Sequence, residues 1–297
     1  TLDTVISAQS AMARAWREDR HGWVAGNMAL WKRHHIRRFF GGHGGLQFAE
    51  TARPPHRRMV WSSIGNTEAD VVRVEDGFLR SRGLGAALTP PLSLVADDLG
   101  IYYDPARESR LERLIAAAVD LPAAERDRAA RLVSRICSDG LTKYNTGQDT
   151  LPMLPQGRRI LVPGQVEDDA SIIRGAGRII TNVELLSFVR AQNPDAVIIY
   201  KPHPDVEAGL RSGALAAAKA LEQADVVASH VEAHALIEEV DEVWTITSLL
   251  GFEALLRGVS VTCTGAPFYA GWGLTQDLGD VPSRRTARPD LTQLAHA

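Results

Sequence analysis

The sequence has little cysteine and no long hydrophobic run. Only Cys137 and Cys263 occur among its 297 residues, and neither belongs to a C-x-x-C motif or a Cys/His cluster. This pattern argues against a disulfide framework or a zinc site, and we expect both to be small core residues in a reducing compartment. No segment approaches the ~20 apolar residues that a transmembrane helix needs, and no signal peptide is visible. The chain begins at Thr1 without Met, so we expect it to be part of a longer protein.

The sequence also lacks an excess of positive charge. Its formal net charge is −3, which argues against nucleic acid as a partner. Basic residues are nevertheless concentrated between Trp31 and Arg58, together with four histidines and the glycine-rich stretch 41–45, for which we expect a plain loop. The basic segment is either a solvated surface or a patch that faces an anionic acceptor or the cytoplasmic leaflet. Its cations are Lys32, Arg33, Arg37, Arg38, Arg53, Arg57 and Arg58.

The composition is otherwise that of a soluble globular protein, with 45% hydrophobic and 23% charged residues. The length allows one large domain or two of about 150 residues. Residues 146–158 contain two prolines and two glycines without a clear pattern, and we predict that they link two domains. In the first half, apolar stretches and helical periodicity predict strands at 59–62, 71–75 and 93–95 and helices at 108–119 and 123–137.

The second half alternates short apolar strands with helices of about ten residues, which predicts βαβ units and a parallel sheet. We therefore predict an α/β protein of the GT-B architecture, in which two Rossmann-like domains with parallel sheets, residues 1–150 and 151–297, face a central cleft. The expected strands are 159–162, 196–200, 225–228, 242–246 and 259–263, and the expected helices are 182–192, 233–239, 248–257 and 289–297.

Ligands bind beyond the carboxyl ends of parallel strands, so the loops after the strands carry the candidate site. One such loop is Lys201-Pro202-His203-Pro204, in which two prolines fix the backbone and with it the direction of the imidazole. A lysine and a histidine on a rigid turn suit a leaving phosphate. The alternative is a surface turn with an incidental histidine.

A second loop, Thr247-Ser248, precedes a helix that is expected to begin near Leu249. A helix N-terminus binds anions because its first amides lack intrahelical partners and its dipole is positive there. The alternative for Ser248 is a simple N-cap, which is compatible with phosphate binding. Glu253 follows on the same helix and is a candidate for binding a ribose hydroxyl, although an isolated helical glutamate is usually solvated.

A third loop places Gln165 shortly before three consecutive carboxylates that end with Asp168 and Asp169. Crowded like charges are typical of functional sites, but a turn or a helix cap is the simpler alternative. Adjacent carboxylates also suit Mg²⁺. Because Lys201, His203 and a helix N-terminus can neutralise a phosphate without a cation, we expect no metal.

A fourth loop, in the first half of the chain, contains Glu75, Asp76 and Arg80. Retaining glycosyl transfer can use two carboxyl groups, one that attacks the anomeric carbon and one that handles the acceptor proton. Glu75 or Asp76 is predicted to form that pair with Asp169, and Arg80 suits the carboxylate of an acidic sugar. The alternative is an ordinary ion pair between Glu75 and Arg80.

Six sequence blocks, in this order, resemble the KpsC/KpsS type of capsule polysaccharide enzyme. The resemblance covers roughly residues 60–280, and its blocks are specific when taken together. They are EDGFLRS at 75–81, LGIYYD at 99–104, GQVEDDAS at 164–171, KPHP at 201–204, TSLLGFEALLRG at 247–258 and PFYAGWGLT at 267–275.

This resemblance implies a retaining, metal-independent β-Kdo glycosyltransferase that needs no cofactor besides its donor substrate, CMP-β-Kdo. It implies an oligo-Kdo lysophosphatidylglycerol acceptor, a cytoplasmic location or a peripheral one on the inner face of the inner membrane, and a second transferase module in the full-length protein. In its terms, residues 1–150 are the acceptor-side domain and residues 151–297 the CMP-sugar-binding domain.

The resemblance also implies roles for single residues. His203 and Ser248 match the positions that hold the CMP phosphate, and Glu253 matches the ribose ligand. The family's Q-x-x-x-D pattern falls on Gln165 and Asp169, which makes Asp169 the expected nucleophile. The neighbouring alternatives and supporting residues complete the predicted site: Asp168 as the alternative nucleophile, Glu75 or Asp76 as the base, and Arg80, Lys201, Pro204, Thr247 and Trp272 as donor-binding residues.

Alternatives remain open at this point for the aromatic turn and for the whole chain. For Trp272 and its neighbour Tyr269, the alternative to walling the donor pocket is a structural aromatic turn. For the whole chain, the alternatives are a CDP-polyol phosphotransferase of the teichoic-acid type and a catalytically silent module that binds glycan.

Overall fold

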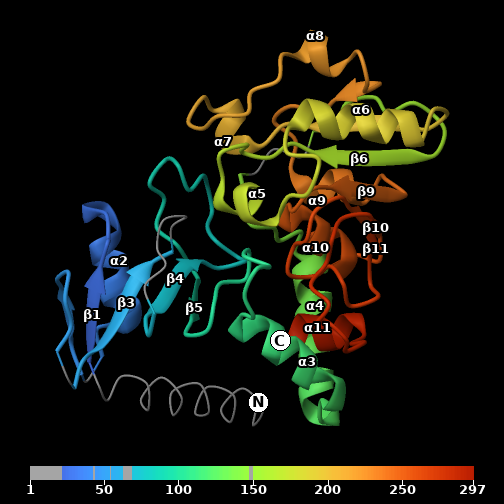
Figure 1. Ribbon diagram of the computed structural model, residues 1–297. Coiled ribbons are helices and arrows are strands. Elements are labelled where there is room, and N and C mark those ends of the chain that lie inside the picture. Colours follow the sequence, from blue (N-terminus) through green and yellow to red (C-terminus); the bar gives the residue numbers. More distant parts are fainter. Residues whose placement is uncertain (1–21, 43, 54, 63–68, 147–149) are drawn as a thin grey trace. The chain divides into compact units, whose positions relative to one another are not determined.

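The computed structural model describes residues 22–42, 44–53, 55–62, 69–146 and 150–297 (Figure 1). By its internal contacts the chain forms two compact units. Unit 1 consists of Thr1–Asp76 with Leu94–Asp98, and unit 2 consists of Gly77–Ser93 with Leu99–Ala297. Each unit is an α/β structure with a mostly parallel sheet, which confirms the predicted fold class at this level.

Unit 1 is built on a five-stranded sheet in the order β2-β1-β3-β4-β5. The pairs among β1 to β4 are parallel, whereas the edge strand β5 runs antiparallel to β4. Helix α2 packs against this sheet through Ile36, which shares a core with Trp23, Met59 and Val74. The elements are β1 (Trp23–Gly26), α2 (Leu30–Phe40), β2 (Leu46–Phe48), β3 (Arg57–Trp61), β4 (Val72–Asp76) and β5 (Leu94–Asp97).

Helix α2 carries much of the basic segment seen in the sequence. Its cations include Lys32 and Arg37, and its apolar residues Leu30 and Phe39 are exposed. Lys32 Nζ lies over the ring of Trp61, at 2.9 Å from its centroid. In the predicted loop 41–45, residue 43 lies outside the described residues.

Unit 2 is built on a six-stranded parallel sheet in the order β11-β10-β9-β6-β7-β8. The first strand, β6, lies in the interior; the chain then adds β7 and β8 on one side and β9 to β11 on the other. This order places a topological switch point between β6 and β9. The strands are β6 (Arg159–Pro163), β7 (Val197–Lys201), β8 (Val226–Val227), β9 (Glu242–Thr245), β10 (Ser260–Cys263) and β11 (Gln276–Asp277).

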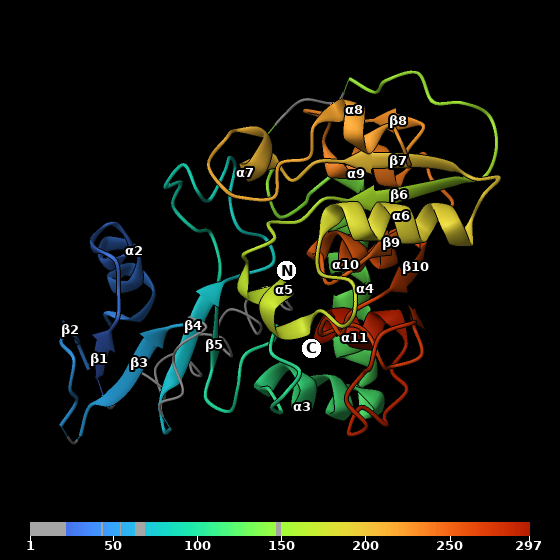
Figure 2. The ribbon, with the colours of Figure 1, turned by 45° about the horizontal axis from the view of Figure 1, so that its top comes forward.

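Both faces of this sheet are buried, because successive residues of one strand point to opposite sides. On β6, Leu161 belongs to one hydrophobic core, while Ile160 and Val162 belong to the other. Helix α6 covers the face with Ile160 (Figure 2), and α9 and α10 cover the face with Leu161. The helices are α3 (Arg110–Ala117), α4 (Ala123–Ser138), α5 (Ala170–Gly175), α6 (Asn182–Gln192), α7 (Pro204–Glu207), α8 (Ala217–Ala220), α9 (Ala233–Ile237), α10 (Leu249–Leu256) and α11 (Leu291–His296), with a 3-10 turn at Ala118–Asp120.

The structure confirms the strands and helices predicted from the sequence, with boundaries shifted by a few residues and α6 matched at both ends. In the predicted linker, residues 147–149 lie outside the described residues, and residues 146 and 150–158 form neither helix nor strand. Helices α3 and α4, which precede the predicted domain boundary at residue 150, belong to unit 2, where α4 packs against α11. The assignment of 1–150 and 151–297 to the acceptor and the donor stays a prediction.

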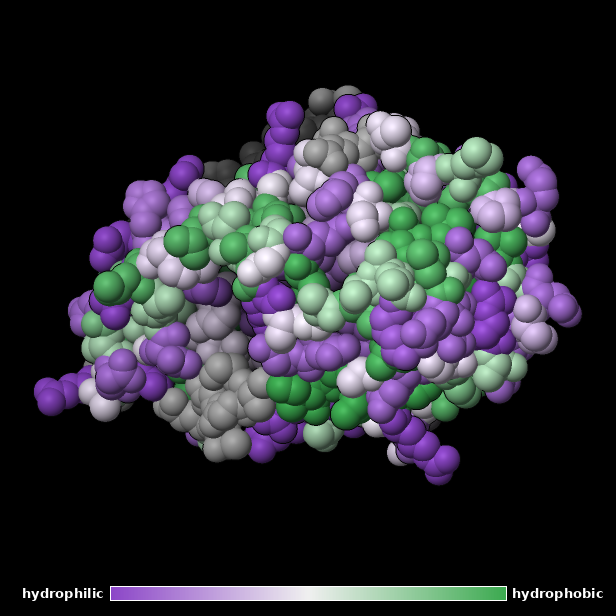
Figure 3. All heavy atoms as spheres, turned by 90° about the horizontal axis from the view of Figure 1, so that it is seen from above, coloured by the Kyte–Doolittle hydropathy of each residue, from purple (hydrophilic) through white to green (hydrophobic). Residues whose placement is uncertain are grey.

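Within the described ranges, no helix is both long and apolar enough to cross a membrane. On the face of the molecule in Figure 3, hydrophobic and hydrophilic residues are interspersed.

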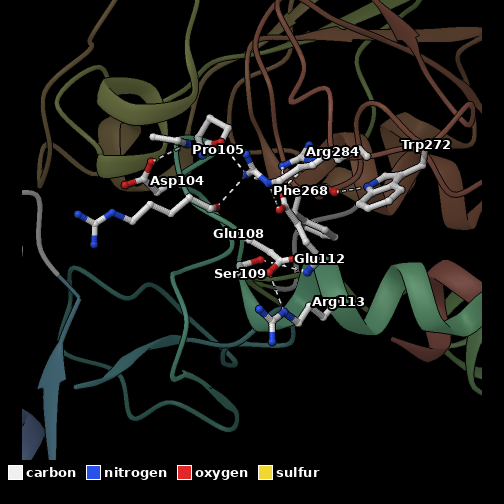
Figure 4. A network of polar contacts seen from close by, with 12 residues as sticks. Asp104, Pro105, Glu108, Ser109, Glu112, Arg113, Phe268, Trp272 and Arg284 are labelled. Atoms are coloured by element: carbon white, nitrogen blue, oxygen red, sulfur yellow. Dashed lines mark hydrogen bonds and ion pairs between the residues drawn. The ribbon is translucent and has the colours of Figure 1, made fainter. Parts of the chain in front are cut away.

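A buried ion-pair network fixes the C-terminal segment to helix α3. Glu112 of α3 accepts hydrogen bonds from Arg284 Nε and Arg285 Nε, each at 2.7 Å. Figure 4 shows Arg284 between Glu112 and the backbone of residues 105–107. Arg285, which is only 1% exposed in its side chain, also donates to the carbonyl oxygens of Pro267 and Ala270. One carboxylate therefore holds two guanidinium groups and, through Arg285, the aromatic turn at 267–273.

We predict that Glu112→Gln lowers the free energy of unfolding by about 3 kcal/mol, because it leaves the buried Arg285 without its counter-charge. Urea-induced unfolding measures the change. The control is Glu108→Gln, which breaks a solvent-exposed ion pair with Arg113 and is expected to cost less than about 1 kcal/mol. Equal effects of the two substitutions would contradict this account.

Candidate functional site

Three of the four predicted loops lie at one edge of the unit 2 sheet. Strand β6 pairs in parallel with β7 on one side and with β9 on the other. The segments that follow these strands, beginning at Gly164, Pro202 and Ile246, therefore leave the sheet at the same edge. This edge contains the switch point between β6 and β9, where α/β sheets of this kind bind ligands.

The side-chain amide of Gln165 joins the loops after β6 and β9. Its Oε1 accepts hydrogen bonds from Thr247 N at 3.0 Å and from Thr245 Oγ1 at 3.2 Å, and its Nε2 donates to Thr247 Oγ1 at 3.0 Å. Its backbone amide donates to Asn182 Oδ1. Because Gln165 is only 5% exposed, these contacts give it a positioning role at the switch point. Its predicted contact with the donor stays a prediction.

Ser248 begins helix α10 at this edge. Its Oγ accepts a hydrogen bond from Leu250 N at 3.2 Å, so it is the N-cap, while its hydroxyl hydrogen can still be donated. Thr245 Oγ1 accepts from Ser248 N, and Tyr269 Oη donates to Ser248 O. Gly251 permits this last contact, because a Cβ there would lie 2.3 Å from Tyr269 Oη. The positive end of the α10 dipole is therefore held rigidly at the switch point.

His203 is the N-cap of α7, and Pro204 is the first residue of that helix. Its Nδ1 accepts a hydrogen bond from Asp205 N at 3.2 Å, so that Nδ1 carries no proton. The proton of the neutral ring must therefore sit on Nε2, which is a hydrogen-bond donor. Burial, and then the positive charge of Lys143, lower the pKa of His203 to about 3. His203 is thus a neutral donor at physiological pH.

Lys201, the last residue of β7, is buried beside carboxylates. It is 6% exposed, and burial lowers its pKa against the opposing effects of Glu207, Glu232 and Glu253. The carboxylates around it keep a positive charge favourable in this interior position.

The segment 141–146 contributes residues that the sequence analysis missed. The Tyr144 ring stands edge-on to the His203 ring, with 5.9 Å between their centroids. Lys143 N donates to Glu253 Oε1 at 2.6 Å, and Arg257 Nη2 donates to Leu141 O. The only signal was a Lys-Tyr pair just before the predicted linker.

Glu253 lies on α10, as predicted, but it is almost completely buried. Burial raises its pKa to about 7, although the amide of Lys143 opposes that rise. One carboxylate oxygen of Glu253 therefore anchors the backbone of Lys143. Its predicted contact with a ribose hydroxyl stays a prediction.

Arg80 belongs to unit 2 and is 1% exposed. Its Nη1 donates to Ser81 Oγ and to Thr89 O, and its backbone amide donates to Lys143 O. A Cβ at Gly85 would lie 2.8 Å from Arg80 Nε. These contacts hold the loop after Arg80 against the segment 141–146. Binding of a sugar carboxylate by Arg80 stays a prediction.

Asp168 and Asp169 lie at the solvent-facing side of the same edge. Asp169 is the N-cap of α5: its Oδ2 accepts from Ser171 N and Ser171 Oγ, and its Oδ1 lies 3.8 Å from Arg211 Nη2. The side chain is 45% exposed, and its charge acts on His203 in the direction that raises the histidine pKa. Asp168 is 63% exposed and lies 3.2 Å from the same Arg211 nitrogen. Asp169 therefore caps α5 with one carboxylate oxygen, and its other oxygen faces Arg211.

Trp272 lies in the hydrophobic core of unit 2. It is 2% exposed, and its indole N–H donates to Phe268 O at 2.8 Å. Tyr269 and Phe268 belong to the same core. In this structure the turn is a packing element, which is the structural alternative considered above, and contact of Trp272 with the donor stays a prediction.

Glu75 and Asp76 are the last two residues of β4 in unit 1. They are half-buried and pair with Val95 and Leu94 of β5, and Glu75 Oε1 accepts from Asp76 N. Their role toward an acceptor stays a prediction. In the part of the chain that the structure describes, no cluster of three or more His, Cys, Asp or Glu residues has an arrangement that would hold a metal ion.

A family model for capsule polysaccharide biosynthesis proteins matches residues 48–148 and 143–297 of the chain. The chain belongs to this family. The lipopolysaccharide-processing protein LpsZ of Rhizobium meliloti is 49% identical over 226 residues, which cover 75% of this chain and 51% of LpsZ. The chain thus spans about half the length of this relative.

Two solved structures are similar in fold to this member of the capsule family. The β-Kdo 2,4 transferase of Thermosulfurimonas dismutans KpsC has a TM-score of 0.81 at 31% identity, covering 92% of this chain and 88% of that one. The β-Kdo 2,7 transferase of the same KpsC has a TM-score of 0.74 at 35% identity, covering 93% and 89%. The resemblance to KpsC-type enzymes inferred from the sequence blocks is confirmed.

We predict that His203 does not titrate between pH 5 and 8, because burial and Lys143 disfavour its protonated form. A pKa below that of the unfolded chain (~6.5) means that the unfolded state binds the extra proton first. Above about pH 6.5 the ring is neutral in both states; as the pH falls toward 3, protonation of the unfolded chain lowers the stability of the fold. ¹⁵N NMR of the imidazole checks this, with Nε2 protonated and Nδ1 unprotonated throughout. A midpoint between pH 6 and 7 would contradict it.

Proposed function

We propose that this chain is a retaining β-Kdo glycosyltransferase module of capsule biosynthesis, with CMP-β-Kdo as its donor. The observation that carries the proposal is that His203, after β7, and the N-terminus of α10, after β9, lie at the same edge of the sheet. Similarity to two solved KpsC structures named as β-Kdo transferases supports the choice of sugar.

The donor phosphate suits this edge on chemical grounds. Departure of CMP leaves charge on its phosphate oxygens, and stabilisation of that charge lowers the barrier. His203 offers a neutral N–H, and α10 offers its N-terminal amides and the Ser248 hydroxyl. The buried Lys201 adds positive charge nearby. These groups supply hydrogen-bond donors and part of the positive charge for which many nucleotide enzymes use Mg²⁺, and we propose a metal-independent reaction.

Retention of configuration is proposed to arise from two successive inversions. In the first, an oxygen of Asp169 attacks the anomeric carbon of Kdo, the bond to the phosphate breaks, and CMP leaves with the electron pair. In the second, an acceptor hydroxyl loses its proton to Glu75, or to Asp76, and displaces Asp169 from the same carbon. Asp168 is the alternative nucleophile.

The acceptor and the setting extend this proposal. We propose a Kdo-bearing lysophosphatidylglycerol glycolipid as the acceptor and a GT-B arrangement of two Rossmann-like domains. A peripheral site of action at the cytoplasmic face of the membrane is supported by the basic helix α2 with its exposed Leu30 and Phe39. Because the chain spans about half of LpsZ, a second transferase module in the full-length protein is also proposed.

We predict that the wild type releases CMP from CMP-β-Kdo and forms a new ketosidic bond to a Kdo-terminated acceptor. His203→Ala is expected to lower kcat/KM about 10- to 100-fold, because it removes a hydrogen bond to a charged group worth roughly 1.5–3 kcal/mol. Product NMR and a CMP-release assay measure both quantities, with the exposed Lys219→Ala as the control variant.

The same assay separates the alternatives. A CDP-polyol phosphotransferase would form a phosphodiester from its CDP-polyol and no ketoside. A silent glycan-binding module would release no CMP, with or without acceptor. Either result would contradict the proposed function.

We further predict that the wild type, given CMP-β-Kdo without acceptor, gains the mass of one Kdo, and that Asp169→Asn does not. The reason is that the amide cannot act as the nucleophile. Intact-protein mass spectrometry and peptide mapping check this, with Asp168→Asn as the matched control that keeps the adduct. Loss of the adduct in Asp168→Asn alone would move the nucleophile to Asp168. Transfer without an adduct in any variant would exclude the covalent route.

A further inference from the structure

The backbone of residues 141–146 is fixed by polar contacts from several sides. Glu253 accepts from Lys143 N, while Lys143 O accepts from the amides of Arg80 and Ser81. Further along, Glu232 accepts from both the amide and the hydroxyl of Thr146. All the contacts of Lys143 in this set are made by its backbone. Its side chain can therefore be changed without removing the bonds that hold the segment.

The Lys143 side chain lies among the groups of the candidate phosphate site. Its Nζ is 5.2 Å from the centroid of the Tyr144 ring, and that ring stands edge-on to His203 at 5.9 Å. The positive charge of Lys143 is the strongest charge effect on the pKa of His203, and it also acts on Asp205 and Glu253. The ammonium therefore lies beside the aromatic ring that contacts His203, the N-cap of α7.

A departing phosphate at this edge requires a positive charge that the other groups do not supply fully. His203 is a neutral donor, as its Nδ1 contact shows. Lys201 is buried at the end of β7 beside Glu207, Glu232 and Glu253. Arg211 lies against Asp168 and Asp169. Lys143 is half-buried and carries its charge on a flexible stem next to His203.

We propose that Lys143 binds the phosphate of the donor nucleotide together with His203 and is a catalytic residue that neutralises the charge on the leaving CMP. This inference rests on the proposed nucleotide site, and it assigns Lys143 as the principal cation of that site. The Lys143 ammonium makes a cation–π contact with Tyr144, whose ring stands beside His203.

The test compares two ligands that differ only in the phosphate. Isothermal titration calorimetry measures the affinity of CMP and of cytidine for the wild type, Lys143→Met, Lys143→Gln and Lys143→Arg. We expect either neutral variant to weaken CMP about 10- to 100-fold, the effect of losing a charge-assisted hydrogen bond, and to change cytidine less than about twofold. Lys143→Arg is expected to restore most of the CMP affinity, because it keeps the charge.

Lys219→Met is the matched control, since this exposed lysine pairs with Glu222 on the surface. Thermal unfolding confirms that each variant is folded, and the neutral variants are also expected to lower kcat for CMP-β-Kdo. CMP affinity within about twofold of the wild type in both neutral variants would overturn the inference while leaving the proposed function intact. An equal loss for CMP and cytidine would also overturn it, because Lys143 would then act through the shape of the site. A wild type that binds neither ligand would overturn the proposed function and, with it, this inference.

Discussion

The candidate site depends on the parallel pairing of β6 with β7 on one side and β9 on the other. This pairing brings three loops, far apart in sequence, to one edge of a sheet. The Gln165 amide then closes the switch point by hydrogen bonds to Thr245 and Thr247. A buried amide group is costly to leave without hydrogen-bond partners. These hydrogen bonds therefore fix the start of α10 more firmly than contacts in a solvent-exposed loop would.

The electrostatics of the edge follow from burial as much as from charge. His203 accepts a hydrogen bond from a backbone amide at Nδ1, so the proton of its neutral ring lies on Nε2. The Nε2–H group is therefore a hydrogen-bond donor. The cations around it differ in their surroundings: Lys201 is buried among carboxylates, Arg211 faces Asp168 and Asp169, and Lys143 lies beside Tyr144. In this site the hydrogen-bond donor, His203, is neutral, and the positive charge comes from other residues nearby. This combination suits a phosphate that gains negative charge as it leaves.

The strands and helices of unit 2 were largely predictable, because apolar runs such as 159–162 and 196–200 alternate with amphipathic helices. Unit 1 was less so: β1 and β2 are only four and three residues long, and α2 is basic along much of its length, so none gave a clear hydrophobic period. The KPHP and Thr-Ser loops were found because proline and hydroxyl residues have local meanings that do not depend on tertiary structure. The same local reasoning offered Ser248 as an N-cap, which the structure confirms for α10. It did not predict the short helix α7, whose N-cap is His203.

Sequence reasoning failed where a role depends on tertiary contacts. Lys143 and Tyr144 follow α4 and precede the linker, and only the fold brings them to His203. Arg80 and Trp272 were chosen for their chemistry. Both are buried and hydrogen-bonded to carbonyl oxygens of their own chain, and their contact with the donor stays a prediction. Nothing in a local pattern separates a guanidinium or an indole that faces a ligand from one that is satisfied by carbonyl oxygens of its own chain.

The central claim is that one phosphate is held by the loops after β7 and β9 together. The most direct test is a crystal structure of this chain with CMP bound. The account predicts a phosphate oxygen within about 3 Å of His203 Nε2 and another within about 3 Å of Ser248 Oγ or the first amides of α10. A CMP phosphate that contacts neither His203 nor the N-terminus of α10 would contradict it.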